Sequence, residues 1–191
     1  MIHYILNGGG ADSLALNKMF INESVVNIFI KPISGISSEF LYFSKQARFF
    51  TTPSIVIDDM DREIDSSKEV NGRNAYYIFQ TLVTLGDKLK GNKLIVGVEP
   101  SSSFVDNKPD YNEVLKNLLT YHNVEYSTPL IDRKMGKDEV FQYISDLPKD
   151  LFVSCFTSNN CGKCRKCISR NYFYKPIENP KTIMELRNGK V

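Results

Sequence analysis

Short apolar runs alternate with longer helix-like stretches along most of this 191-residue chain, and this alternation most constrains its fold. The runs are rich in β-branched residues, as buried strands usually are. Strands are predicted at residues 2–6, 25–30, 54–59 and 93–98, and helices at 13–20, 37–47, 72–91, 111–123 and 137–147. Because strands that alternate with helices build parallel sheets, the sequence predicts an α/β domain with helices on both faces.

The composition is that of a globular protein, with 42% hydrophobic and 24% charged residues. No apolar run reaches the 18 or so residues of a membrane span, and the N-terminal residues lack the features of a signal peptide. We therefore expect a cytoplasmic, reducing setting, where the four cysteines are ligands or reactive thiols rather than disulfides. The formal charge of +2 is too small to indicate a nucleic-acid partner.

The most specific motif is the cysteine spacing C-x5-C-x2-C-x2-C, formed by Cys155, Cys161, Cys164 and Cys167. Four thiolates this close in sequence can complete a tetrahedral zinc site with no open position, which is typical of a structural metal. An iron–sulfur cluster and a reactive thiol pair are the alternatives, although the run does not continue as in ferredoxins. The lysines and arginines inside and after the motif would offset the thiolate charge or are simply solvated.

Three glycines follow the first predicted strand, in the segment "NGGGADS" at residues 7–13. In a doubly wound sheet, ligands bind beyond the carboxyl ends of the strands, where this loop is expected to lie. Glycines let backbone amides approach an anion, and the start of the next helix attracts negative charge. Asp12 would help to hold Mg²⁺ and Ser13 would donate a hydrogen bond. A strand-to-helix turn with an Asp cap is the alternative, whereas the Walker-type and G-x-G-x-x-G loops do not match.

The segment Gly8–Ser13 resembles the S-G-G-x-D-S signature of the PP-loop ATP pyrophosphatases, with Gly8 in place of the leading serine. Together with the cysteines, it resembles the QueC family of 7-cyano-7-deazaguanine synthases. The matching positions are Arg73 and Asn74 in "GRNAYYIF", Gly97 in "VGVE", Pro129, Leu130, Asp132, Lys137 and Glu139 in "TPLIDRKMGKDEVF", and Ser154, Gly162 and Arg170 around the four cysteines. These matches run in family order from residue 4 to about residue 173.

This resemblance implies a Rossmann-like fold of the adenine nucleotide alpha hydrolase type, with an ATP-binding domain at residues 1–150 and a zinc-binding segment at 151–191 packed on it. It implies that ATP and ammonia convert 7-carboxy-7-deazaguanine to the nitrile through carboxylate adenylation, with Mg²⁺ and a structural Zn²⁺. The expected ATP-binding residues are Gly8, Gly9, Gly10, Ala11, Asp12, Ser13, Arg73, Asn74 and Gly97. Asp12 and Lys137 are the expected catalytic residues, and a homodimer is the expected assembly.

The substrate loop departs from the family pattern, which reads approximately Y-P-D-C-R. Pro109 and Asp110 remain as candidates for substrate binding, but Lys108, Tyr111 and Asn112 replace the other residues. One alternative is therefore a QueC-like enzyme that activates a different carboxylate or joins it to a macromolecular amine. Because Gly8 replaces a serine, a catalytically inactive nucleotide-binding or regulatory protein is a further alternative. A nucleic-acid partner is not indicated, since the cysteine cluster lacks interleaved aromatic residues.

Overall fold

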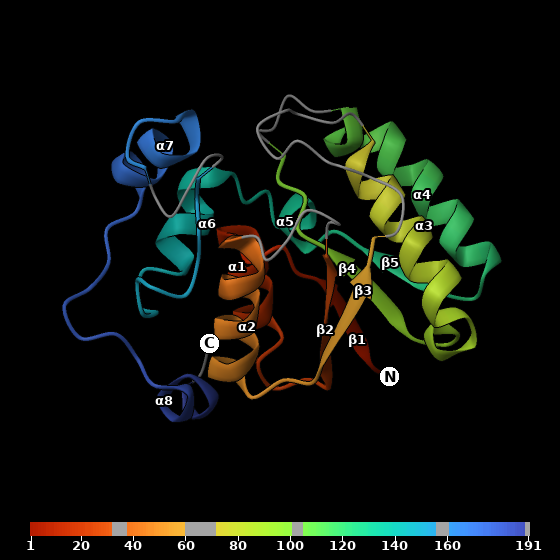
Figure 1. Ribbon diagram of the computed structural model, residues 1–191, viewed down its shortest axis with the longest axis horizontal. Coiled ribbons are helices and arrows are strands. Elements are labelled where there is room, and N and C mark those ends of the chain that lie inside the picture. The colour runs from red at the N-terminus through yellow and green to blue at the C-terminus, as the bar shows by residue number, and fades with distance from the viewer. Residues whose placement is uncertain (32–37, 60–71, 101–104, 156–160, 190–191) are drawn as a thin grey trace.

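The centre of the protein is a five-stranded sheet in which every neighbouring pair of strands is parallel (Figure 1). The computed structural model describes residues 1–31, 38–59, 72–100, 105–155 and 161–189. The strands are β1 (His3–Leu6), β2 (Val25–Lys31), β3 (Ser54–Asp58), β4 (Lys93–Val96) and β5 (Glu125–Ser127). Their order across the sheet is β3-β2-β1-β4-β5, so the predicted α/β parallel-sheet fold is confirmed.

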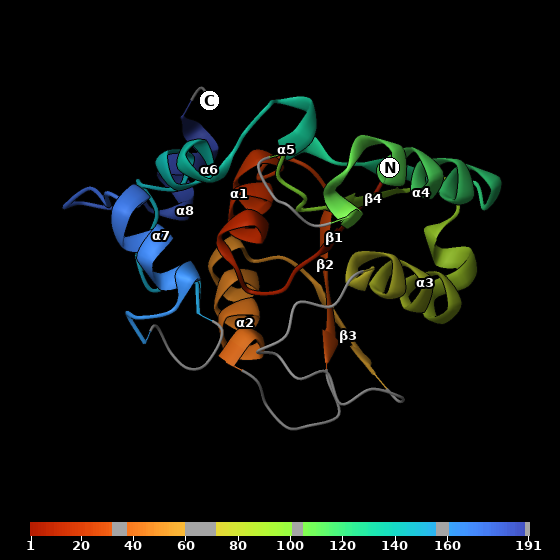
Figure 2. The same cartoon turned by 90° about the horizontal axis from the view of Figure 1, so that it is seen from above.

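Helices cover both faces of this sheet (Figure 2). They are α1 (Ala11–Met19), α2 (Ser38–Phe50), α3 (Arg73–Leu85), α4 (Pro109–Tyr121), α5 (Pro129–Asp132), α6 (Lys137–Tyr143), α7 (Arg165–Phe173) and α8 (Ile183–Asn188), with 3-10 turns η1 (Gly86–Leu89) and η2 (Val105–Asn107). Helices α1 and α2 lie on one face, and α3 and α4 on the other. No helix within the described ranges has the length and apolar content that crossing a membrane requires.

Two hydrophobic cores lie on the two faces of the sheet. The first joins Leu14 of α1 to Phe141 of α6 and Phe152, and the second joins Ile28 of β2 to Leu94 of β4 and to the inner sides of α3 and α4. Strands β1, β2 and β4 are buried on both faces, so they read in sequence as continuous apolar runs. Strand β3 at the edge is visible from its β-branched residues, although Val56 is exposed.

The helix predicted over 72–91 is interrupted in the structure. Helix α3 ends at Leu85, because Gly86 adopts a positive φ of 46°, and a 3-10 turn continues to Leu89. The sequence predicts a broad apolar face on this helix that includes Phe79 and Val83, but both side chains are exposed. The helix is apolar on more than one side, and the sheet covers only the side that carries Ile78 and Leu85.

Helix α4 also buries a different side from the predicted one. The apolar residues Val114, Leu118 and Tyr121 recur at a helical spacing that predicts the inner face, yet Val114 and Tyr121 are exposed. Asn112, Leu115 and Leu119, which are spaced i, i+3 and i+7, pack against the sheet instead. The hydroxyl of Tyr126 on β5 donates to Asn112 Oδ1 at 2.8 Å, which makes a polar residue acceptable on the buried side.

Four strands or α-helices have no counterpart among the predicted ones: β5, α5, α7 and α8. Strand β5 has only three residues, too few to show a periodic pattern. Helix α8 does carry a sequence signal, because Thr182 and Glu185 form a capping box at its start. Leu186 of α8 packs into the first core, together with Leu151 and Phe152. The C-terminal segment thus shares a core with α1, and the boundary at residue 150 stays a prediction.

Candidate functional site

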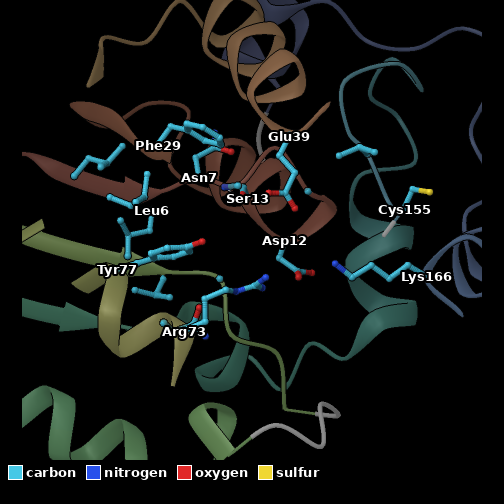
Figure 3. Close-up of a pocket in the computed structure, with 18 residues that line it drawn as sticks. Leu6, Asn7, Asp12, Ser13, Phe29, Glu39, Arg73, Tyr77, Cys155 and Lys166 are labelled. Carbon is cyan, nitrogen blue, oxygen red and sulfur yellow. Dashed lines mark hydrogen bonds between the residues drawn. The ribbon is translucent and has the colours of Figure 1, made fainter. Parts of the chain in front are cut away.

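The strand order reverses at β1, whose neighbours are β2 on one side and β4 on the other. In open α/β sheets such a reversal leaves a crevice beyond the carboxyl ends of the two strands. A cavity of about 170 Å³ lies there (Figure 3). The predicted site residues that line it are Gly8, Gly10, Asp12, Ser13, Arg73, Asn74, Gly97 and Cys155. The glycine loop, the start of α3, the end of β4 and the cysteine segment therefore meet at one place.

The three glycines of the loop are not equivalent. Gly9 has a φ of 70°, and a Cβ atom there would lie 2.4 Å from the Glu39 carbonyl oxygen and 2.9 Å from the Phe43 nitrogen. Only glycine allows the loop to approach α2 this closely. A Cβ atom on Gly8 would instead meet no atom within 4 Å. Gly8 is the position where the PP-loop signature has serine, and the structure has space for that side chain.

Buried asparagine side chains support the glycine loop through hydrogen bonds. Asn7 Oδ1 accepts a hydrogen bond from the Gly9 amide at 2.8 Å, and Asn7 Nδ2 donates to Asn27 Oδ1 at 2.9 Å. Asn27 exchanges hydrogen bonds with Asn17, whose Nδ2 donates to the Ser13 carbonyl at 2.9 Å. The sequence analysis missed this network. An asparagine inside the apolar strand "VVNIFI" was the available signal, because a buried polar group needs partners.

Helix α1 presents its start to the cavity. It begins at Ala11, and Gly10 at the N-cap supplies no side-chain hydrogen bond. The first amides of a helix have no partner inside the helix and carry partial positive charge, so they suit an anionic ligand. The Ser13 hydroxyl accepts a hydrogen bond from the Gly8 amide at 3.2 Å, which closes the loop onto the helix.

Asp12 and Lys137, the two predicted catalytic residues, form an ion pair beside this helix start. Lys137 Nζ lies 2.9 Å from Asp12 Oδ1 and 3.0 Å from Oδ2. Burial opposes the charged form of Lys137, but the Asp12 carboxylate outweighs it and raises the pKa of Lys137 above its usual value. Gly97 leaves room for the pair, since a Cβ atom there would lie 3.1 Å from Asp12 Cβ. A carboxylate oxygen is a suitable Mg²⁺ ligand, so a cation at Asp12 would compete with Lys137.

Two cations and one more carboxylate line the cavity together with Asp12. Arg73 lies in the first turn of α3, Glu39 in the first turn of α2, and Lys166 near the start of α7. The side chains of Arg73 and Lys166 extend toward Asp12 from opposite sides in Figure 3. Burial lowers the pKa of the Lys166 ammonium; Glu39 partly opposes this shift, and Arg73 adds to it. The site can therefore offer both cations for phosphate or carboxylate groups and carboxylates for a divalent metal.

The four cysteines converge as their spacing predicts. Their Sγ atoms all lie within 4.8 Å of one another, and two pairs, Cys155–Cys164 and Cys161–Cys167, are 3.9 Å apart. A tetrahedral zinc with metal–sulfur bonds of about 2.3 Å has sulfur–sulfur edges of about 3.8 Å. Burial raises the pKa of the Cys167 thiol to about 12, so a bound cation would be required to keep it as a thiolate. The cluster can hold a metal, and its geometry fits zinc.

Hydrogen bonds join the cysteine segment to the glycine loop. The Val153 amide donates to the Gly9 carbonyl at 3.1 Å. The buried Gln46 side chain of α2 donates through Nε2 to the carbonyls of Gly10 and Leu151, at 3.1 and 3.0 Å. Because these hydrogen bonds connect residues 151–153 to the loop after β1, the cysteine segment forms one wall of the cavity.

Other predicted ligand-binding residues are not among those that line this cavity. Ala11 is buried at the start of α1. Pro109 and Asp110 form the exposed first turn of α4, and they are not among the described residues that line this cavity. Asn112, in the same segment, donates through Nδ2 to the Lys108 carbonyl at 2.9 Å. The substrate-binding role of Pro109 and Asp110 stays a prediction.

Solved structures with a similar fold include a crystal structure described as a predicted subunit of tRNA methyltransferase from Methanocaldococcus jannaschii. It matches with a TM-score of 0.56 and 21% identity over 77% of each chain. At this level of identity the similarity concerns the fold alone.

Sequence comparisons are more specific. The chain is 29% identical over 126 residues to a 7-cyano-7-deazaguanine synthase from Prochlorococcus marinus, an alignment that spans 59% of this chain and 55% of the relative. This chain thus matches little more than half of that relative's length. The family described as queuosine biosynthesis protein QueC matches residues 37–178, a range that includes Arg73, Lys137 and all four cysteines. The chain belongs to the QueC family.

Proposed function

We propose that this protein is an ATP-dependent enzyme that converts 7-carboxy-7-deazaguanine and ammonia to 7-cyano-7-deazaguanine. The observation that carries the proposal is the convergence of the glycine loop, Asp12 and Arg73 on one cavity, with Lys137 paired to Asp12, in a chain of the QueC family. The printed name of the Prochlorococcus relative supports the choice of product.

The chemistry explains why ATP is needed. A carboxylate is a poor electrophile, and attack of its oxygen on the α-phosphate of ATP turns that oxygen into part of a good leaving group. Ammonia then displaces AMP to give the amide, and a second activation lets the amide oxygen leave to give the nitrile. Both carboxylate oxygens end on AMP, so we expect two ATP to yield two AMP and two pyrophosphates for each nitrile.

Each residue of the cavity has a part in this reaction. The amides at the start of α1 and in the loop bind the pyrophosphate portion of ATP. Asp12 and Glu39 would supply oxygen ligands for Mg²⁺, which would neutralise charge on the departing pyrophosphate. Arg73 and Lys137 bind phosphate oxygens. The four cysteines would hold Zn²⁺, which would stabilise the opposite wall.

The direct test is to incubate the metal-loaded protein with ATP, Mg²⁺, ammonia and the acid, and to measure the nitrile by mass spectrometry. The Asp12→Ala variant should lose about 10³-fold or more of the rate of AMP formation, since it lacks a ligand for the charge on pyrophosphate. Asp87→Asn, in the exposed turn η1, is the matched control and should keep the wild-type rate. A folded wild-type protein that forms no nitrile, or an Asp12→Ala variant with full activity, would contradict the proposal.

A second candidate function is activation of a different carboxylate, or its transfer to an amine of a macromolecule. The observation that favours it is the segment 108–112, where Asn112 is bound to Tyr126 rather than directed to the cavity. AMP release that depends on another acid or amine, and not on 7-carboxy-7-deazaguanine, would support this candidate. Absence of any ATP binding in calorimetry would instead favour a regulatory protein that retains only the fold.

A further inference from the structure

Lys166 enters the cavity from inside the cysteine motif. It lies between Cys164 and Cys167, in the first turn of α7, and it lines the same cavity as the glycine loop. Figure 3 shows its side chain extending toward Asp12, opposite the side from which Arg73 approaches. From the sequence, Lys166 was expected only to offset thiolate charge or to be solvated. In the structure, Lys166 instead lines the cavity in which the ligands of the proposed reaction would bind.

Charged groups of both signs lie around the Lys166 ammonium. Glu39 and Asp12 attract it, whereas Arg73 and Lys137 repel it. The start of a helix carries partial positive charge, and α7 has no acidic residue in its first turn. An anionic ligand that lies between Arg73 and Lys166 would be attracted by both cations.

The backbone around Lys166 is fixed by the cysteine segment. The Ser154 hydroxyl donates to the Lys166 carbonyl at 3.1 Å, and the Cys167 thiol donates to the Ser154 carbonyl at 3.0 Å. A metal bound by the flanking Cys164 and Cys167 would hold the same turn. The direction of the Lys166 side chain therefore depends on the metal-binding segment rather than on the sheet.

We propose that Lys166 is a ligand-contacting residue of this site, and that its ammonium binds an anionic oxygen of the reactants on the side of Asp12 opposite Arg73. This inference rests on the proposed function, in which a carboxylate must approach the α-phosphate of ATP. Two anions that approach each other repel, and a cation on each side of them reduces that repulsion. The oxygen belongs either to the α-phosphate or to the carboxylate of the acid, since both present the same charge to an ammonium.

Lys166→Met removes the charge and keeps most of the side-chain volume, and Lys166→Arg keeps the charge. Lys163→Met is the matched control, because Lys163 is an exposed lysine of the same motif and lies outside the residues that line the cavity. All three variants should keep the wild-type metal content. We expect Lys166→Met to lower kcat/KM for AMP formation by about 10- to 100-fold, the usual cost of losing a hydrogen bond to a charged group, and Lys166→Arg to restore most of it.

Calorimetric titration with AMP, pyrophosphate and the acid, each added alone, shows which oxygen Lys166 binds. If Lys166 binds the α-phosphate, Lys166→Met should weaken AMP binding and leave pyrophosphate binding unchanged. If it binds the carboxylate, the affinity for the acid should fall and that for AMP should not. Unchanged binding of AMP and acid in Lys166→Met, with unchanged kcat/KM, would overturn the inference and leave the proposed function intact.

Ligand protection of the wild-type protein separates the two proposals. Acetylation of Lys166, followed by mass spectrometry, should slow when AMP or the acid is bound, while acetylation of Lys163 should not change. If ATP does not bind at all, the proposed function fails. Protection of Lys166 by the acid alone would then still support its role as an anion-binding residue, and no protection by any of these ligands would overturn it.

Discussion

The two walls of the cavity are stabilised in different ways. The glycine loop rests on buried asparagines, and the close contact of Gly9 with α2 fixes its path. Helix α7, on the other wall, has much less apolar packing, because Ile168, Tyr172 and Phe173 are exposed and Cys167 is buried beside the other thiols. A loop that is part of the core can hold its shape without a cross-link. A helix with few buried side chains needs one, and four thiolates on a metal would provide it.

The strongest way to break this comparison is to remove a metal ligand. Cys167→Ser should abolish stoichiometric metal binding and reduce AMP formation by about 10³-fold or more, because the wall that carries Lys166 loses its order. The far-ultraviolet circular dichroism should stay close to that of the wild type, since the sheet and its two cores do not depend on the metal. Amide hydrogen exchange should accelerate in residues 161–173 and not in the strands.

Ile168→Ala is the control for this variant, because Ile168 is an exposed neighbour of Cys167 on the same helix. It should keep both metal and activity. A Cys167→Ser protein with one metal per chain and normal activity would show that the cysteine wall is held by packing after all. Global unfolding of this variant would show that the metal supports the whole fold rather than one wall.

The support of the glycine loop can be removed at Asn27, which is fully buried and forms hydrogen bonds with Asn7, Asn17 and Thr52. Asn27→Asp keeps the shape but replaces the amide donor by a carboxylate, which leaves acceptors without donors or buries a charge. We expect a loss of about 2–4 kcal/mol in the free energy of unfolding. Urea denaturation measures it, with the exposed Asn117→Asp on α4 as control. Equal midpoints for the two variants would contradict a supporting role for the network.

The same comparison shows what the sequence could predict. The strands were visible because burial on both faces makes them continuously apolar, and the cysteine cluster followed from spacing alone. Helix faces were harder, because α3 and α4 are apolar on more than one side. Phe79 and Val114 match a helical period as well as the buried residues do, yet they are exposed. Only the tertiary structure decides which side the sheet covers.

Contacts across large sequence separations that belong to no motif could not be predicted. Gln46 donates to the carbonyls of both Gly10 and Leu151, and no local sequence pattern indicates such a contact. In the sequence, Lys166 does not differ from any other charged residue between cysteines, whereas in the structure its side chain extends toward Asp12. The sequence predicts the loop, Arg73 and the four cysteines as site residues, because each belongs to a motif with its own chemistry. Their arrangement around one cavity follows from the strand order, which the sequence does not show.

A smaller effect on stability should come from Asp146, which links α1 to the segment before α8. It lies 2.6 Å from Lys18 of α1 and 3.0 Å from Lys181, which precedes α8. Burial opposes ionisation of Asp146, but hydrogen bonds from both lysines outweigh it and hold the pKa of the carboxyl below its usual value. The pair therefore stabilises the fold above the unfolded-state pKa of about 4, and this contribution is lost as the pH falls through the lower folded-state pKa.

Asp146→Asn should lower the free energy of unfolding by about 1.5–3 kcal/mol at pH 7, because it leaves the buried Lys18 without its carboxylate. The difference from the wild type should shrink as the pH is lowered below about 4, which thermal melts at several pH values would show. Asp150→Asn breaks an exposed pair with Lys45 and should change stability by less than about 0.5 kcal/mol. A deficit that does not depend on pH would contradict the electrostatic origin.

The smallest effect, and the one that most sharpens the view of the loop, is expected from Gly8→Ser. This change restores the serine of the PP-loop signature at a position where an added Cβ atom meets nothing within 4 Å. We expect the free energy of unfolding to change by less than about 0.5 kcal/mol. A new hydroxyl at the cavity should raise ATP affinity by no more than about 10-fold, the value of one hydrogen bond.

Gly9→Ser is the matched control, because the same side chain there would collide with the Glu39 carbonyl at 2.4 Å and strain a φ of 70°. If both variants melt like the wild type, the loop is not built into the core as its contacts indicate. If Gly8→Ser alone is tolerated but binds ATP more weakly, the cavity has adapted to glycine at this position, and the missing serine is part of how this chain binds its nucleotide.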